Sequence, residues 1–408
     1  MWIDSTVPVI FLTRTYTLDP GNLSKSSGGT FGAAQMATRE RLTVGRGEGK
    51  LYLIGLREDG EFRSNLHFQN IDKELEITVE VEVFDNTGTL LSRQTFPING
   101  HSLRQKGLGQ HFGVSGVASA YATLEVIEGD GRLNSWASVI DNITGDFTFT
   151  DAVHSNQVAG KVVSEQHYLV AAVAHTTGVL NSVWRSGLDI FNEPTFPSQT
   201  VTLRFVAEYD RTGAVGEFLE KTVTVPSGEQ LSWDDVLVDL FGVPENTKTQ
   251  GALHIFSQDK LVVNSHTHNK RSDGGSLGMG LPGLTSGDLI SADGRAGIMP
   301  GLTNSGDTRT NVGLAEYSGR DTQVSILFYS TDQENQLLNR NDPVKRNVPA
   351  DDHLQLLNIF EQVEDLREIT VEKIKAEVWV EGGGSIYSYA TTIDNETGDP
   401  TAFTAAEE

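Results

Sequence analysis

The sequence predicts an all-β protein built from antiparallel β-sandwiches in an elongated array, with only short helical turns. Two observations predict this fold class. Segments in which apolar and polar residues alternate, such as 75–83, are separated by turn signals along the whole chain. The chain also repeats itself, because the same short motifs return at intervals of a little over 120 residues.

The clearest strand pattern lies at 75–83, where Leu, Ile and Val alternate with Glu and Thr. This period of two residues is typical of a strand with one buried and one wet face. Asp85 to Gly88 follows it, and Asp210 to Gly213 stands at the matching point after the strand pattern at 201–207. Both segments have the composition of hairpin turns.

Two segments have a weaker helical signal. Ser232 to Asp235 has the spacing of a capping box and precedes an apolar run that ends at Gly242. Asn358 stands before Ile359 and Phe360 and predicts the cap of a second helical turn. Short strands with frequent turns, in units of a little over 100 residues, describe immunoglobulin-like sandwiches.

Two recurring motifs define the repeat. An Arg followed by Ser or Thr, Asn or Gly and an aliphatic residue begins three similar strands, at Arg63, Arg185 and Arg309. A second motif, interpreted as the last strand of each unit, begins at Thr13, Ser135, Ser265 and Ser388. An Arg that recurs once per unit predicts a structural brace rather than three separate anion sites.

The segments after the second motif alternate between two types. Glycine-rich stretches follow the first and third copies, at 28–32 and 274–278, whereas Asp-Asn-x-Thr-Gly-Asp loops follow the second and fourth. We therefore predict four units of alternating type, which are the C-terminal half of a type A sandwich at 1–56, a type B sandwich at 57–160, a type A sandwich at 161–302 and a type B sandwich at 303–408.

The predicted unit at 1–56 lacks its front half, because residues 1–3 align with residues 253–255 in the middle of the second type A unit. We expect a fragment of a longer array, since a half sandwich at a natural terminus would leave an open sheet edge. The alternative is that another chain completes this half unit. The opening residues also lack the basic and apolar regions of a signal peptide.

Composition excludes several classes of partner and chemistry. The chain has 408 residues, no cysteine and a formal net charge of −24. Disulfide scaffolds, thiol nucleophiles and Cys-ligated metals are thereby excluded. An acidic surplus of this size disfavours nucleic acid, because nucleic-acid affinity comes mainly from Lys and Arg. No apolar segment is long enough to predict membrane insertion.

The two Asp-Asn-x-Thr-Gly-Asp loops are candidate calcium sites. Each offers two carboxylates and an amide oxygen within six residues, which suits a hard cation. The candidate ligands are Asp141, Asn142 and Asp146 in one loop and Asp394, Asn395 and Asp399 in the other. The alternative interpretation is a pair of Asx-type turns whose charges face water.

His266 and His268 form an H-x-H pair that predicts two imidazoles on one face of a strand, about 6 to 7 Å apart. Zinc sites use this spacing. The repeat favours a different interpretation, because Arg14, Trp136 and Tyr389 stand at the position of His266 in the other copies. The position then simply tolerates large amphipathic side chains.

No catalytic motif stands out. The chain contains no Gly-x-Ser-x-Gly elbow, Walker loop, Rossmann fingerprint or His-Glu-x-x-His, and the repeats leave no segment of domain size for an asymmetric active site. We therefore expect no enzyme and no cofactor, with calcium as the one alternative. The five tryptophans, Trp184 among them, are mostly core candidates, and a sugar-stacking platform is the alternative interpretation.

The repeat resembles tandem immunoglobulin-like modules of large secreted or cell-surface bacterial proteins. The residues that carry the resemblance are Val170–His175, Trp184–Ser186, Val225–Glu229, Ser232–Gly242 and Ile393–Pro400. The resemblance covers nearly the whole chain and implies an extracellular or cell-surface location. Its motifs are signatures of a fold type and define no reaction.

The expected function is that of a non-catalytic stalk, spacer, adhesive or fibre segment. Modules that contact only their neighbours give length and stiffness, and an acidic surface keeps them soluble. The expected partners are other domains of the same or a longer chain, with self-association or a surface glycan as further candidates. The alternative is a module that binds glycan or calcium through loops at the ends of the units.

Overall fold

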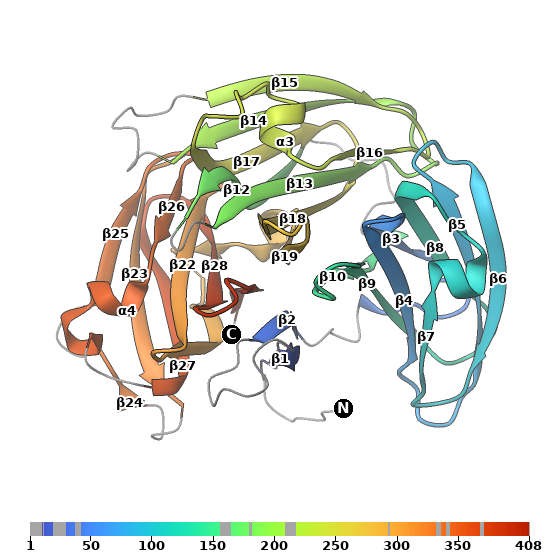
Figure 1. Ribbon diagram of the computed structural model, residues 1–408, viewed down its shortest axis with the longest axis horizontal. Coiled ribbons are helices and arrows are strands. Elements are labelled where there is room, and N and C mark those ends of the chain that lie inside the picture. The colour runs from blue at the N-terminus through green and yellow to red at the C-terminus, as the bar shows by residue number, and fades with distance from the viewer. Residues whose placement is uncertain are drawn as a thin grey trace.

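The computed structural model describes residues 10, 12–18, 30–36, 42–155, 165–178, 182–208, 218–292, 294–331, 336–339, 343–367 and 371–407. The prediction of an all-β fold is confirmed, since these ranges form several antiparallel sheets with a few short helical turns. Most strands belong to three units, and in each unit two layers of strands enclose an apolar core (Figure 1). We call them the first, second and third unit in chain order.

The first unit extends from β3 to β11. Its first sheet contains, in spatial order, β11 (Val153–His154), β3 (Lys50–Glu58), β8 (Val117–Gly129), β5 (Ile77–Asp85) and β6 (Leu90–Ile98). Its second sheet contains β10 (Phe147–Asp151), β9 (Leu133–Asp141), β4 (Phe62–Asn70) and β7 (Leu103–Gly107). A single π-helical turn, Leu108–Phe112, buries its first and last side chains in the core between them.

Strand β5 shows how the alternating pattern produces this core. Ile77, Val79 and Val81 are fully buried in it. Glu82, on the face that the sequence predicts to be wet, is only 8% exposed. Side chains of other strands in the sheet contact it, because its carboxylate accepts hydrogen bonds from Lys50 Nζ of β3 at 3.2 Å and Arg93 Nε of β6 at 2.9 Å.

The second unit extends from β12 to β19 as one folded sheet. One layer contains β15 (Phe218–Val225), β14 (Gln199–Ala207), β17 (Thr249–Ser257) and β12 (Gln166–Thr177). The other contains β16 (Gln230–Trp233), β13 (Val183–Phe191), β18 (Val262–Lys270) and β19 (Ser276–Pro282). The layers are joined where β12 pairs with β13, and α3 (Val236–Asp239) buries Val236 and Leu237 in the core.

The third unit extends from β20 to β30. Its first sheet contains β24 (Gln336–Leu337), β25 (Val344–Val348), β23 (Thr322–Ser330), β27 (Val371–Gly382), β21 (Gly297–Asn304) and β30 (Ala406–Glu407). Its second sheet contains β20 (Ile290–Ser291), β28 (Ser385–Asp394), β22 (Thr308–Glu316), β26 (His353–Leu356) and β29 (Pro400–Thr404). The short helices of this region are η5 (Ser286–Asp288), α4 (Ile359–Gln362) and η6 (Glu364–Leu366).

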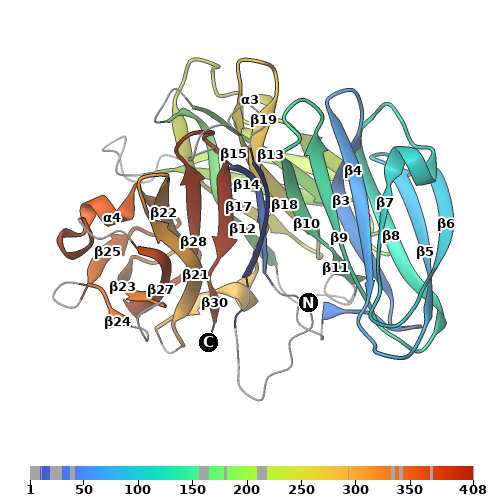
Figure 2. The same ribbon diagram turned by 60° about the horizontal axis from the view of Figure 1, so that its bottom comes forward.

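The remaining described strands form a hairpin, β1 (Leu12–Leu18) and β2 (Thr30–Met36), which lies beside the third unit (Figure 2). Strand β2 contacts β29 of the third unit and β10 of the first, while β19 of the second unit contacts both β10 and β29. We call these four strands the hub. The units therefore surround a common centre, and the expectation of an elongated array is wrong for this part of the chain.

Apolar side chains also join successive units face to face. Tyr52 and Tyr121, on the first sheet of the first unit, pack against Phe191 of the second unit, with ring centroids 5.3 and 4.5 Å away. Leu169 and Ala252 of the second unit share a buried cluster with Tyr387 and Tyr389 of the third. These contacts hold the units together as one packed body.

The predicted hairpin turns and helix caps have different outcomes. The hairpin turn after β5 is confirmed, because Gly88 has a φ of +81° and Asp85 Oδ1 accepts hydrogen bonds from the Thr87 and Thr89 amides. Asp210 to Gly213 lies outside the described residues. The cap of α3 is Asp235 rather than Ser232, and Asn358 is left-handed and makes no capping hydrogen bond, so the predicted caps were wrong.

The predicted unit boundaries at 56/57 and 302/303 fall inside strands of the described fold. Strand β3 spans the first boundary and pairs with β8 in the first unit. Strand β21 spans the second and pairs with β27 in the third. The motif that begins at each recurring Arg is therefore preceded by a further strand of the same unit. In the described ranges, no helix is both long and apolar enough to cross a membrane.

We predict that Gly251→Ala destabilises the second unit. An added Cβ at Gly251 would lie 1.9 Å from the Val206 carbonyl oxygen, so the paired strands β14 and β17 would have to separate. The expected loss is about 1–3 kcal/mol in the free energy of unfolding, measured by urea denaturation. Gly60→Ala is the control, because its added methyl would meet nothing within 4 Å. Equal stability of the two variants would contradict the prediction.

Candidate functional site

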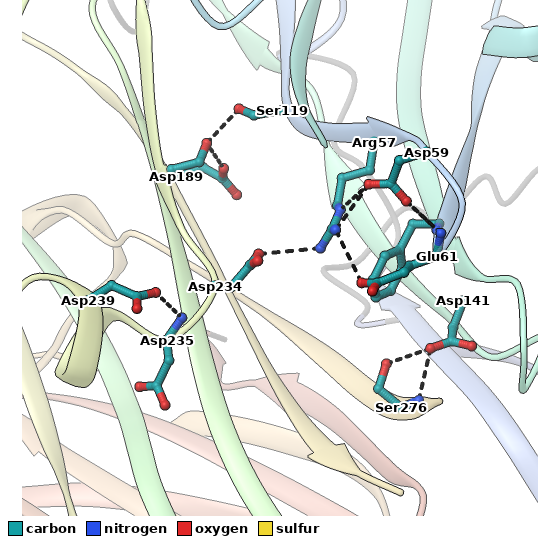
Figure 3. Close-up of polar contacts among 12 residues, drawn as sticks. Arg57, Asp59, Glu61, Ser119, Asp141, Asp189, Asp234, Asp235, Asp239 and Ser276 are labelled. Carbon is teal, nitrogen blue, oxygen red and sulfur yellow. Dashed lines mark hydrogen bonds and ion pairs between the residues drawn. The ribbon is translucent and has the colours of Figure 1, made fainter. Parts of the chain in front are cut away.

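The first Asp-Asn-x-Thr-Gly-Asp loop binds the free edge of β19 in the second unit (Figure 3). Asp141 Oδ2 accepts hydrogen bonds from the Ser276 amide at 2.8 Å and the Ser276 hydroxyl at 2.9 Å. Asp146 Oδ2 accepts one from the Gly278 amide at 2.7 Å, and the Thr144 hydroxyl donates to the Ser276 carbonyl at 2.8 Å. The loop therefore joins two units.

The second loop makes the same set of contacts with β2. Asp394 Oδ2 accepts from the Thr30 amide at 2.9 Å and the Thr30 hydroxyl at 3.1 Å. Asp399 Oδ2 accepts from the Gly32 amide at 2.9 Å, and the Thr397 hydroxyl donates to the Thr30 carbonyl at 2.8 Å. We call these two sets of contacts the acidic latches.

The other oxygens of the loops are largely occupied as well. Asp141 Oδ1 accepts hydrogen bonds from two amides of its own turn, each at 2.8 Å, and Asp394 Oδ1 does the same at 2.9 Å. The predicted amide ligands Asn142 and Asn395 accept hydrogen bonds from Arg63 and Arg309, at 2.6 and 2.7 Å. Most candidate calcium ligands are thus already bonded to the protein.

Among the six candidate ligands, Asp146 and Asp399 each retain a buried oxygen, Oδ1, that has no hydrogen-bond partner in the part of the chain that the structure describes. Burial raises the pKa of Asp146 to about 7. Burial, together with the charge of Asp146, raises the pKa of Asp399 as well. The two latches therefore place two mutually repelling carboxyl groups at the hub, and each favours its protonated form.

His266 and His268 are half-buried and lie close to the first acidic latch. Their ring centroids lie 5.6 Å apart, and burial lowers the pKa of His266 to about 4. Burial and the neighbouring His266 also hold the pKa of His268 well below its usual value. Both line a cavity of about 310 Å³ between the first and second units, next to Asp141 and Asp146. In the described ranges, no group of three or more His, Asp or Glu side chains is placed to hold a metal ion.

The same junction contains charged residues that the sequence did not single out. Arg57 of the first unit bonds Asp59 at 3.0 Å and Asp234 of the second unit at 3.3 Å (Figure 3). The Asp189 carboxylate accepts a hydrogen bond from Ser232 at 2.6 Å, and burial raises its pKa to about 6. Of these contacts, the Arg57–Asp234 ion pair depends on the packing of the two units, and no local motif could have revealed it.

The recurring arginines have different surroundings in the three units. Arg63 is exposed and bonded to Asn142, whereas Arg185 is partly buried and forms an ion pair with Asp235 at 3.2 Å. Arg309 is half-buried and bonded to Asn395. Each arginine bonds the unit that carries it, as expected of a structural brace.

A larger cavity, of about 780 Å³, lies between the second and third units. Its lining includes Trp184 from β13, Arg309 from β22, Thr391 from β28 and Asn395 from the second loop. Trp184 is half-buried, so it is not the core residue that the sequence favoured. The sequence could not reveal this cavity, because residues more than 200 positions apart line it.

Comparisons with known proteins do not identify the chain. No family and no curated protein matches it. Among solved structures, "Crystal Structure of Thermotoga maritima 1070" is 13% identical, covers 31% of this chain and 97% of its own, and has a TM-score of 0.23. An anti-sigma factor domain-containing protein from Clostridium clariflavum is 6% identical, and the match covers 98% of this chain and 100% of that protein, with a TM-score of 0.16. These scores are too low to support an argument.

We predict that the hub carboxyls make the protein less stable as the pH rises. The pKa of Asp146 is higher in the folded chain than the usual value of about 4 in an unfolded one, so its contribution is complete below about pH 4 and is lost as the pH passes about 7. Asp146→Asn should therefore show a smaller fall in melting temperature between pH 5 and pH 8 than the parent protein.

The control for this experiment is Asp130→Asn, since the Asp130 side chain is 78% exposed. This variant should keep the pH dependence of the parent. If Asp146→Asn and Asp130→Asn show the same pH dependence as the parent protein, the hub carboxyls do not contribute as described.

We also predict that chelation leaves the melting temperature unchanged. The carboxylates of Asp141 and Asp394 already accept amide hydrogen bonds with both oxygens, so calcium would have to displace them. The measurement is thermal unfolding in EDTA and in excess calcium, with zinc content determined by mass spectrometry. A melting temperature that falls in EDTA and returns with calcium would support the calcium hypothesis instead.

Proposed function

We propose that the chain is a non-catalytic structural module of an extracellular or cell-surface bacterial protein, built from tandem immunoglobulin-like sandwiches. The observation that carries this proposal is the pair of acidic latches. In both, Asp and Thr side chains of a loop bond the edge of a strand outside their own unit, which is β19 in the first latch and β2 of the hairpin in the second. The residues that looked most like a site thus serve assembly.

The closed arrangement favours one form of this function over another. Because the hub brings β2 of the first hairpin to β29 of the third unit, the modules surround a centre instead of following one another in a line. This arrangement suits an adhesive head or a node of a fibre better than a straight spacer. Strand edges covered by the latches also protect such a module against sheet-to-sheet aggregation.

The alternative function, binding of a glycan or another small ligand, is favoured by the larger cavity. Its lining includes Asn395 of the second latch loop, so a loop at the end of a unit does border a space of ligand size. A module that assembles through its latches and binds through this cavity would combine both functions.

The test of the structural function is to open the latches. An amide has one acceptor oxygen, so the side chain of the Asp394→Asn variant cannot accept hydrogen bonds from both its own turn and Thr30. We expect the double variant Asp141→Asn/Asp394→Asn to have a larger radius of gyration in X-ray scattering and a lower melting temperature, because each latch loses charged hydrogen bonds worth about 1.5–3 kcal/mol.

Asp130→Asn serves again as the matched control and should keep the compact shape. A double variant with unchanged shape and stability would contradict the latch. Reproducible catalytic turnover by the purified parent chain would contradict the non-catalytic assignment. Electron microscopy of the same samples separates compact particles from filaments and shows whether self-association accompanies the opening.

A further inference from the structure

The cavity between the second and third units has the dimensions of a ligand site. Its volume of about 780 Å³ lies within the range of roughly 300–1,000 Å³ that small-molecule sites occupy. It borders β12 and β13 on one side and β22 and β28 on the other, so its walls are strands of two packed sheets. Such walls hold side chains in fixed positions.

Arg309 is the first indication of what this cavity binds. Of the three recurring arginines, Arg63 is exposed to water and Arg185 has a carboxylate partner, Asp235. Arg309 is half-buried and donates a hydrogen bond to the neutral side chain of Asn395, and it forms no ion pair with any of the described residues. Burial lowers its pKa, which indicates that its charge is poorly solvated. The nearby Asp394 carboxylate offsets this burial in part, but its oxygens are bonded to Thr30 and to its own turn, so a ligand carboxylate within the cavity would supply the direct ion pair that Arg309 lacks.

Thr391 is a second and independent indication. It lines the cavity, it is 1% exposed, and its hydroxyl has no hydrogen-bond partner among the described residues. A buried hydroxyl without a partner costs free energy, and a bound hydroxylated molecule would satisfy it. Thr391 lies on β28, close to the end of the strand at Asp394, and Asn395 follows directly.

Trp184 supplies the third surface. Its indole N–H already donates to the Ser182 hydroxyl at 2.9 Å, so what it offers the cavity is the apolar ring. Aromatic rings of this kind stack on the apolar faces of flat or cyclic ligands. The lining also contains the exposed carboxylate of Glu361, which disfavours a ligand with several negative charges.

We propose that this cavity binds an acidic sugar of the uronic acid class, with its carboxylate on Arg309, a hydroxyl on Thr391 and a ring face on Trp184. The three groups require a single negative charge, hydroxyl groups and a cyclic body in one molecule, and a uronate combines them. The inference rests on the ligand-binding alternative proposed above. It does not use the latch contacts with β2 or β19, although Arg309 bonds Asn395 of the second latch loop.

The experiment is titration of the full chain with glucuronate and galacturonate, followed by tryptophan fluorescence and calorimetry. Glucose and acetate are the reference compounds, because one lacks the carboxylate and the other lacks the ring. We expect a uronate to bind at least about tenfold more tightly than either reference. Absence of millimolar or tighter binding for both uronates, or equal binding of acetate, would overturn the proposal.

Variants then locate the site. Arg309→Gln should weaken uronate binding about tenfold or more, and Thr391→Val about fivefold. The matched control is Arg63→Gln, which removes the equivalent arginine and its bond to Asn142 in the first unit. If Arg309→Gln alters folding, Thr391→Val carries the test, since valine keeps the shape of threonine. Equal affinities of all three variants would overturn the proposal, while scattering curves report separately on the latches.

Discussion

The arrangement of the units depends on carboxylates that accept hydrogen bonds from the edge of a strand outside their own unit. The outer edges of β2 and β19 would otherwise present free amide groups, which invite pairing with other chains. Asp141 and Asp394 occupy these amides and at the same time close their own turns, so each carboxylate uses both oxygens. Full use of both oxygens offsets the cost of removing a charge from water.

The second carboxylate of each latch is less well compensated. Asp146 and Asp399 each accept one amide from the neighbouring strand and leave one oxygen without a partner. Burial and mutual repulsion then favour protonation, which links the stability of the hub to pH. The latches therefore both close the fold and make its stability depend on pH.

The junctions between units combine apolar and polar contacts. Tyr121 packs on Phe191 and also donates a hydrogen bond to the Gly228 carbonyl at 2.9 Å. At the next junction, Tyr317 stacks on His167 with ring centroids 4.0 Å apart and donates to its carbonyl at 3.0 Å. Side chains that make both kinds of contact restrict the orientation of each unit against the next.

Much of the fold could be predicted from the sequence because its determinants are local. The alternation at Ile77 to Val83 places the apolar side chains in the core, and Asp85 to Gly88 forms the hairpin turn by bonding to itself. The recurring Arg was interpreted as a brace, and Arg63, Arg185 and Arg309 each bond a residue of their own unit. The all-β class follows from such patterns alone.

The candidate site depended on contacts that no local pattern contains. The sequence by itself determined that Asp141, Asp146, Asp394 and Asp399 would lie in similar loops. Only the tertiary structure decided that their oxygens bond strand edges, because Ser276 and Thr30 are distant in sequence from the loops that bind them. The physical reason is that a carboxylate bonds whichever donor packing brings within reach, and packing is a property of the whole chain.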